Sequence, residues 1–439
     1  MVLGTAKLDP LTRLPLRHVA LGLAIRELLA PWTGHPYDFE IWTRLGFYMQ
    51  NLANPYRTLP YVPGLSFSPY PTTGSISYPP FSAFIFALTY RIYALLGEPS
   101  RFAYYFLLKQ PMVWADIGVA IVLTKIILLS GDARSARTAL LVWLYFPLGI
   151  IISSMWGQLD PISLFLSLLA IYFFLVSKWL PSAAMLGLAI YLKTLPIVFL
   201  PVFLMQSRTR NNRLGHSLIS LVIPIAGALV PALAFNWGYY AMYNNLSFQV
   251  DIPLEGAMSV LGLAYYALPL AGLALYVTGS IWIPVLLSTY VYVWKKGLPL
   301  FHGLLIVILA FSISRPFLPE QWSLYPLALL LLVQTRENVG HFLGLASSST
   351  AFLAFNNGLL VRFFTPVSVG AFNWDVFVDP SPYVALWVVI RSLLALLYFT
   401  ESFLVIRGRE SIVYRAILSV RPDWSLQSRH ISPTEVGHV

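Results

Sequence analysis

The chain has 439 residues, of which 58% are hydrophobic and only 10% are charged. Soluble domains carry about 25% charged residues, so this composition excludes an ordinary soluble protein and predicts an integral membrane protein. The net charge is +10, and the Lys and Arg residues lie mainly at the ends of apolar segments and in the tail. This distribution favours cytoplasmic anchoring over nucleic-acid binding. The absence of cysteine excludes disulfides, thiolate metal sites and cysteine nucleophiles.

Apolar segments near the roughly 20 residues that a membrane-crossing helix needs recur from residue 14 to residue 406. They predict an all-α polytopic membrane protein, because a barrel would show alternation instead. We expect one domain over residues 1–406 with about twelve spans, followed by a basic cytoplasmic tail at 407–439. The expected spans include 14–31, 80–96, 111–129, 138–154, 162–176, 182–205, 214–235, one ending at 295–296, 300–314, 324–333, 342–360 and 384–406.

The first apolar segment carries charged residues and has no small-residue cleavage site, so we expect it to stay as the first span. A long polar loop follows at 32–78, rich in Tyr, Pro and Gly, and we expect it to be ordered and to lie on the outer face. Within it, residues 38–52 repeat apolar side chains at helical spacing. This spacing predicts an amphipathic helix lying on the membrane, opening with the carboxylates of Asp38 and Glu40.

Simple alternation of the early spans conflicts with the charge rule. It would put the basic turn at 134–137 outside and the polar turn at 158–160 inside, away from Asp38. If segment 80–96 were re-entrant, both conflicts would vanish, but segment 182–205, which a lysine and a proline interrupt, would then have to double back. The sequence leaves both topologies open.

Carboxylates at one side of a helical bundle serve ion coupling in transporters, activation of a hydroxyl nucleophile, or structural ion pairing. As a base, Asp38 would take the proton of an acceptor hydroxyl. A departing phosphate would need cations aimed at it, and the candidates are Lys193, Arg315, Arg57 and Arg44. These residues alone support a transporter and a transferase about equally well.

Each candidate also has a purely structural interpretation. The pair Asp38 and Glu40 could face water in an exposed loop, and Asp116 could be hydrogen-bonded within the bundle. The other structural interpretations are an interfacial anchor at Trp156-Gly157-Gln158, a snorkelling Lys193, and a polar helix start at Glu320 and Gln321.

Five motifs occur in an order that is known from one family. They are Asp38-Phe39-Glu40 with Asn54-Pro55-Tyr56 and Tyr78-Pro79-Pro80; Lys109 with Trp114-Ala115-Asp116-Ile117; Phe146-Pro147 through Ser153-Ser154-Met155-Trp156-Gly157-Gln158-Leu159-Asp160; Ala183-Ala184 through Lys193-Thr194-Leu195-Pro196; and Pro319-Glu320-Gln321-Trp322-Ser323-Leu324-Tyr325-Pro326. This order resembles the GT-C glycosyltransferases that use polyprenyl-phosphate sugars. It is most similar to the first mannosyltransferase of GPI-anchor synthesis and its prokaryotic relatives.

The resemblance implies a GT-C fold with a catalytic first outer loop at 32–78, in which Asp38 and Glu40 serve the acceptor hydroxyl. The substrate-binding candidates are Tyr78, Asp116, Gln158, Asp160, Lys193, Arg315, Glu320 and Gln321. The usual Asp-x-Asp is Asp38-Phe39-Glu40 here, which argues against a metal role for the pair. Residues beyond Gly340 match no motif of the family.

The implied reaction inverts the anomeric centre of a sugar, most simply mannose, as it moves from a dolichyl or other polyprenyl phosphate to a lipid-linked or glycan acceptor. It would take place on the outer or luminal face of the cell or ER membrane. The expected partners are the donor, the acceptor and membrane lipid, with room for a small accessory subunit. No cofactor is required, because the donor carries its own activation, and a divalent cation stays an open question. The alternative is a transporter or flippase of lipid-linked sugars.

Overall fold

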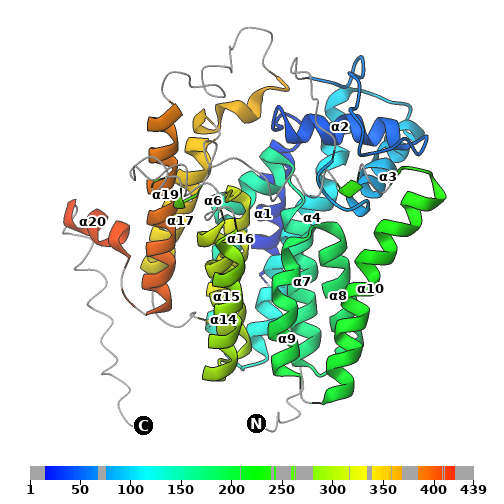
Figure 1. Cartoon of the computed structure of the whole chain (residues 1–439). Helices are drawn as coiled ribbons and strands as arrows, with labels where there is room; N and C mark the ends of the chain where they lie inside the picture. The colour runs from blue at the N-terminus through cyan, green and yellow to red at the C-terminus, as the bar shows by residue number, and fades with distance from the viewer. Residues whose placement is uncertain are drawn as a thin grey trace, which may run out of the picture.

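The computed structural model describes residues 15–67, 76–207, 209–238, 242–243, 259–261, 263, 280–315, 317–333, 339–356, 358–367, 384–407, 409 and 411–420. In this part of the chain all the regular elements are helices (Figure 1). They are α1 (Leu16–Leu29), α2 (Asp38–Met49), α3 (Phe81–Leu95), α4 (Arg101–Leu128), α5 (Ala133–Tyr145), α6 (Pro147–Ile150), η2 (Ile151–Trp156), α7 (Asp160–Leu175), α8 (Trp179–Leu192), η3 (Leu195–Phe199), α9 (Leu200–Gln206), α10 (Arg210–Ala234), α14 (Trp282–Lys296), α15 (Leu300–Ser314), η5 (Glu320–Ser323), α16 (Leu324–Val333), α17 (Val339–Asn356), η6 (Gly358–Phe364), α19 (Val384–Ile406) and α20 (Ile412–Val420).

The apolar helices make the chain an integral membrane protein. Among the described residues, three helices are long and apolar enough to cross a membrane: Arg101–Leu128, Arg210–Ala234 and Leu386–Ile406. The bent pair Ala133–Tyr145 and Pro147–Trp156, with 49° between its halves, would make a fourth. Further apolar helices have only 10–17 residues, and a helix of about 15 residues spans about 22 Å of a hydrocarbon core that is about 30 Å thick. The count of about twelve spans therefore stays a prediction.

Helix α3 does not carry the chain to the other end of the bundle. α1 rises from the end where the chain begins, and α2 and α3 lie together at the opposite end (Figure 1). At one end of α3, Phe81 stacks on Tyr191 at the close of α8, with ring centroids 5.1 Å apart. Toward its other end, Tyr90 meets Tyr104 in the first turns of α4 at 5.5 Å. The chain therefore crosses back only through α4, as the re-entrant alternative requires.

The reversal inside segment 182–205 that the re-entrant alternative requires is also present. His216 near the start of α10 contacts both Ser182 at the start of α8, at 3.2 Å, and Phe203 in α9, with ring centroids 5.2 Å apart. The chain thus rises through α8, turns after Lys193, and descends through η3 and α9. Pro196 and the three-residue-per-turn winding of η3 explain why one continuous helix does not form here.

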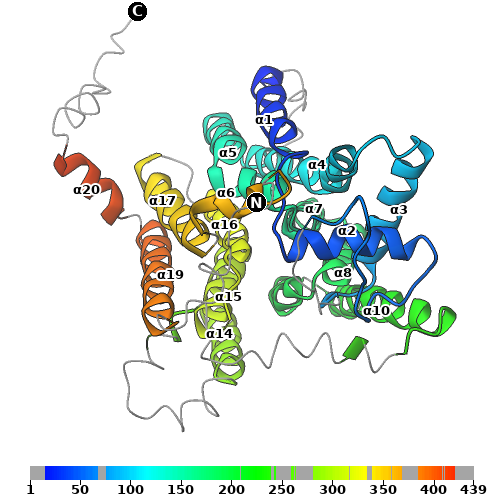
Figure 2. The same cartoon turned by 90° about the horizontal axis from the view of Figure 1, so that it is seen from above.

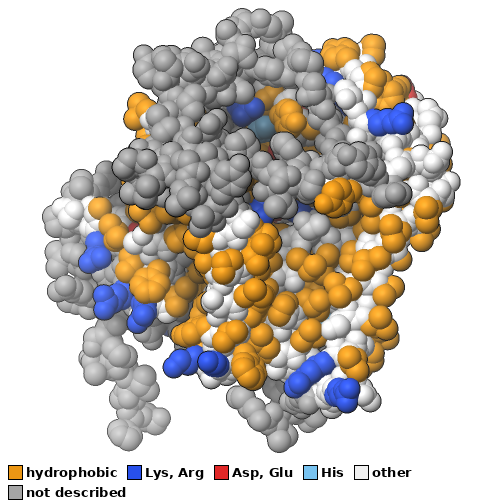
Figure 3. Space-filling view, viewed as in Figure 1, with side chains coloured by type: hydrophobic (Ala, Val, Ile, Leu, Met, Phe, Trp, Pro, Cys, Tyr) orange, Lys and Arg blue, Asp and Glu red, His pale blue; other side chains and the backbone are white. Residues whose placement is uncertain are grey.

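This topology places the basic turns away from Asp38. Exposed Lys and Arg side chains lie at the lower end, below a broad apolar band, and others lie on the left side and at the upper end (Figure 3). Those at or near the lower turns between helices are Lys125, Arg134, Arg137, Lys178, Arg210, Arg213, Lys295 and Lys296. The conflict between simple alternation and the charge rule therefore disappears.

Two further predicted spans are interrupted or bent in the structure. Segment 342–360 covers most of α17, which ends at Asn356, and the start of η6, within which Leu359 and Leu360 adopt left-handed backbone angles (φ 53° and 71°). Segment 138–154 is bent where Phe146 leaves the helical region before Pro147. The loop at 68–75 and the tail at 421–439 lie outside the described residues.

Candidate active site

Asp38 is the first residue of α2, which lies flat across the upper end of the bundle (Figure 2). Its Oδ2 accepts hydrogen bonds from Trp156 Nε1 at 3.0 Å and from Gln158 Nε2 at 2.6 Å. Among the described residues, no hydrogen bond ends on Oδ1, and 25% of the side-chain surface is exposed. One oxygen is thus fixed by the protein, while the carboxylate stays within reach of an incoming hydroxyl.

The two donors to Asp38 come from the sharp turn that follows η2. Gly157, between them, has φ of 78°, a left-handed angle that favours glycine. A Cβ at this position would meet Phe39 at 2.7 Å and Lys109 at 3.2 Å. Glycine is therefore required here both for backbone shape and for space, and the turn it allows aims Trp156 and Gln158 at one oxygen.

Helix α4 holds η2 in place through two buried charges. Lys109 Nζ donates to the carbonyl oxygens of Ala30, Ser154 and Met155 at 2.9, 2.7 and 3.3 Å, and also to Thr33. Seven residues on, Asp116 accepts from Ser153 Oγ at 3.1 Å. Residues 153–155 of η2 are thus tied to one helix, and the end of α1 that leads to Asp38 is tied with them.

Asp116 is predicted to bind substrate, but its bonds lie inside the bundle. It is fully buried and paired with Arg26 Nε at 2.7 Å. It also accepts from Trp143 Nε1 at 2.8 Å. Buried carboxylates persist when they are paired and hydrogen-bonded in this way. This geometry favours a supporting role for Asp116 through η2.

His35, which was given no role from sequence, shapes the start of α2. Its Nδ1 accepts the backbone N–H groups of Tyr37 and Asp38 at 3.3 and 3.1 Å. An Nδ1 that accepts hydrogen bonds carries no proton, so the ring is the neutral Nε2–H tautomer. The ring stacks on Trp156 with centroids 4.9 Å apart. His35 therefore sets the position of both Asp38 and one of its donors.

The surroundings of Asp38 suit a general base. Burial raises the pKa of Asp38 above its ordinary value. The hydrogen bonds from Trp156 and Gln158 and the charges of Arg362 and Lys193 lower it and offset part of that rise. A carboxylate with a raised pKa is a stronger proton acceptor once it is ionised.

A pocket of about 350 Å³ has two cations in its wall, and the charge of one of them, Lys193, acts on the Asp38 carboxylate. Lys193 and Arg315 both line it, with Tyr78 and Trp322. The guanidinium of Arg315 is ringed by Trp282, Phe311 and Trp322, with centroids 5.5, 5.4 and 6.0 Å away. Two fixed cations in an otherwise apolar pocket match a ligand with an anionic head and an apolar body.

Lys193 is held in the pocket by two other predicted residues. Asp160, at the first turn of α7, pairs with its Nζ at 2.5 Å. The ring of Tyr78 lies 5.1 Å from the same Nζ. The structure thus brings together Asp38, Tyr78, Gln158, Asp160 and Lys193 from four separate stretches of the sequence.

The remaining predicted residues are packed more deeply. Glu40 is fully buried, pairs with Arg44 at 2.6 Å and accepts the N–H of Phe67 at 3.0 Å. These bonds tie α2 to the loop that follows, so they favour a positioning role over contact with substrate. Glu320 and Gln321 are buried in η5, next to Trp322 of the pocket wall.

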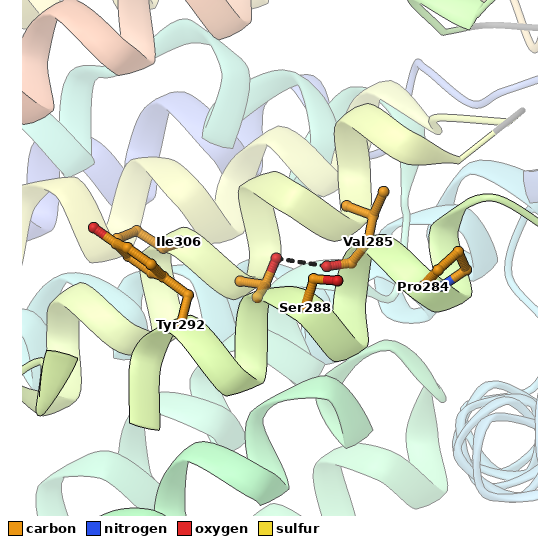
Figure 4. Close-up of a pocket in the computed structure, with 6 residues that line it drawn as sticks. Pro284, Val285, Ser288, Tyr292 and Ile306 are labelled. Atoms are coloured by element: carbon orange, nitrogen blue, oxygen red, sulfur yellow. Dashed lines mark hydrogen bonds between the residues drawn. The ribbon is translucent and has the colours of Figure 1, made fainter. Parts of the chain in front are cut away.

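A second, more open pocket of about 420 Å³ lies on another side of α14 (Figure 4). Its lining has hydroxyl groups but no charged side chain, and the hydroxyl of Thr289 already donates to the carbonyl oxygen of Val285 at 2.7 Å. This groove therefore has no group suited to a phosphate.

Arg362 in η6 is a neighbour of Asp38 that sequence analysis missed. Its charge acts on the Asp38 carboxylate, although it lies past the last family motif. The signal in the sequence is a single cation inside the apolar run Leu359-Leu360-Val361-Arg362-Phe363-Phe364. Among the described residues, no group of three or more His, Asp or Glu side chains could hold a metal ion.

Two comparisons bear on this site. The family model of the mannosyltransferase PIG-M matches residues 152–249, which include Trp156, Gln158, Asp160 and Lys193 but not Asp38. The crystal structure of ArnT from Cupriavidus metallidurans bound to undecaprenyl phosphate aligns with a TM-score of 0.45 and 14% identity, covering 88% of this chain and 77% of that one.

A likeness of that degree establishes neither a shared activity nor a shared ligand for this chain. No curated protein matches the sequence significantly. The family match, in contrast, covers the turn that holds Asp38 and the lysine of the pocket. Over residues 152–249 it confirms the resemblance to the first GPI mannosyltransferase and supports a glycosyltransferase of the polyprenyl-phosphate-sugar class.

Proposed function

We propose that the chain is a polytopic, inverting GT-C glycosyltransferase that moves mannose from a polyprenyl-phosphate donor to a lipid-linked or glycan acceptor. The single observation that carries this proposal is that Lys193, whose charge acts on the Asp38 carboxylate, lines a pocket together with Arg315. A base next to two cations supplies what displacement of a phosphate by a hydroxyl requires. The match to a mannosyltransferase family supports mannose as the sugar.

In the proposed reaction the acceptor hydroxyl donates its hydrogen bond to Asp38. As the hydroxyl oxygen bonds to the anomeric carbon from one face, the carbon–oxygen bond to phosphate breaks on the opposite face, which inverts the centre. The proton passes to Asp38, and the polyprenyl phosphate leaves with its charge toward Lys193 and Arg315. Trp156 and Gln158 hold the carboxylate still, so that little reorganisation is needed as the proton moves.

The proposed orientation puts Asp38 on the outer or luminal side. It is supported by the exposed Lys and Arg side chains at the other end of the bundle, since such residues stay cytoplasmic. The chain has no cysteine, so a single introduced cysteine reports its own side without further engineering. In sealed vesicles of known orientation, Arg57→Cys should react with an impermeant maleimide from outside and Arg134→Cys only from inside. The reverse labelling would overturn this orientation.

Transfer is tested with purified protein in lipid, labelled polyprenyl-phosphate mannose and a lipid acceptor, with wild type and Asp38→Asn side by side. Product from wild type alone supports enzyme, donor and base together. A glucose-bearing donor run in parallel tests the choice of sugar, and added chelator tests for a divalent cation. Movement of the labelled lipid between leaflets without product would overturn the transferase in favour of a carrier.

A further inference from the structure

The short helix η6 is docked against the residues that hold Asp38. The N–H of Gly34 donates to the carbonyl oxygen of Phe363 at 2.7 Å. The ring of Phe363 lies 6.0 Å from His35 and 5.5 Å from Trp156, measured between centroids. Both groups set the place of Asp38, so the segment that carries Arg362 is part of the same packed unit.

The η6 segment is also fixed at its far end and in its own backbone. Arg101 at the start of α4 donates to the carbonyl oxygen of Pro366 at 3.2 Å. Leu359 and Leu360 both have positive φ, which costs a non-glycine residue roughly 1–3 kcal/mol each and persists only where neighbouring contacts enforce it. The contacts of Phe363 and Pro366 therefore hold this backbone in place. The same segment carries half-buried Arg362, whose charge acts on Asp38.

The charges around Asp38 can be assigned element by element. His35 is neutral at Nδ1 because it accepts two backbone N–H groups, and Tyr37 and Tyr78, which also act on Asp38, are uncharged phenols at neutral pH. Two positive charges act on the carboxylate, Lys193 from the pocket and Arg362 from η6.

We propose that Arg362 is a positioning residue of the active site, whose guanidinium, brought there by η6, keeps the Asp38 carboxylate in its ionised, proton-accepting form. This inference rests on the proposed function in that it takes Asp38 as the base. It extends the active site to a segment that neither the motifs nor the matched residues 152–249 include. A purely structural role for Arg362 would change folding but not the ionisation of Asp38.

The ionisation of Asp38 can be followed without turnover. Trp156 donates its indole N–H to Asp38, so in protein labelled with 5-fluorotryptophan the fluorine resonance of Trp156, assigned with Trp156→Phe, should titrate with the carboxylate. Asp38→Asn should abolish that step. Arg362→Gln and Arg362→Met should move the midpoint to higher pH, and Arg362→Lys should restore it. The control Arg91→Gln removes an exposed arginine of α3 and should leave the midpoint unchanged.

The same variants are then compared by their pH–rate profiles. Without the positive charge, Asp38 stays protonated to higher pH, so transfer by Arg362→Gln should fall roughly tenfold on the acid side of the profile and return close to wild type on its alkaline side. A midpoint that does not move in folded Arg362→Gln or Arg362→Met would overturn the inference. If wild type transfers no sugar at any pH, the proposed function fails, and the fluorine titration still decides the role of Arg362.

Discussion

Replacing Asp38 by Asn changes the chemistry of the site while leaving its hydrogen bonds possible. The amide oxygen can still accept from Trp156 and Gln158, which bond only Oδ2 among the described residues. Two charge-assisted bonds become neutral ones, each weaker by roughly 1 kcal/mol. The loss of a partly desolvated charge acts in the opposite direction. We therefore expect the free energy of unfolding to change by no more than about 1 kcal/mol.

Turnover should respond far more strongly. A positioned general base contributes roughly 10²- to 10⁴-fold, or about 3–5 kcal/mol of transition-state stabilisation. The assay is single-turnover transfer of labelled sugar, with thermal unfolding of the same samples as the control for folding. Asp38→Ala is a useful comparison, because it leaves both donors without their acceptor and should also destabilise the fold. Wild-type turnover by folded Asp38→Asn would refute the assignment of the base.

Four further outcomes follow from the same geometry. Wild-type transfer should fall as the pH drops through the raised pKa of Asp38, because protonation removes the base, and a pH–rate profile checks this. Lys193→Ala should reduce the use of donor by about 100-fold while the KM for acceptor changes little, as measured by varying each substrate in turn. Asp116→Asn should lower the free energy of unfolding by about 3 kcal/mol with an unchanged donor KM, since it breaks the buried pair with Arg26. Gly157→Ala should lower turnover without changing donor binding, because the added Cβ displaces the turn that holds Asp38.

The local features of the fold were predictable because each depends on a pattern close in sequence. The amphipathic spacing after Asp38 predicts α2, and the lysine and proline inside segment 182–205 predict its break. The chain reversal at that break depends instead on packing between distant segments, such as His216 against Phe203. No local pattern shows which helices share an end of the bundle, so the topology needed the structure.

The candidate site also has parts that could be predicted from the sequence and parts that could not. Asp38, Lys193 and the turn at Trp156-Gly157-Gln158 stand out as polar groups in an apolar chain. Arg362 is brought near Asp38 by a segment that turns at the left-handed residues Leu359 and Leu360 and docks through Phe363. Leucine gives no sequence signal for such a turn, in contrast to glycine at position 157. Sequence analysis could therefore find the cations of the pocket but not the one on η6.

Four buried charges among the described residues, Lys109, Asp116, Lys193 and Arg315, separate into two kinds by their surroundings. Lys109 donates hydrogen bonds to backbone carbonyl oxygens, and Asp116 accepts them from Arg26, Trp143 and Ser153. Both are enclosed by protein. Lys193 and Arg315, in contrast, each present a cation to the wall of a pocket. Desolvating a charge costs several kcal/mol in either case, but only the second kind can recover part of that cost from a ligand. On this argument we propose that the first kind positions Asp38 and that the second kind is placed to bind a departing phosphate.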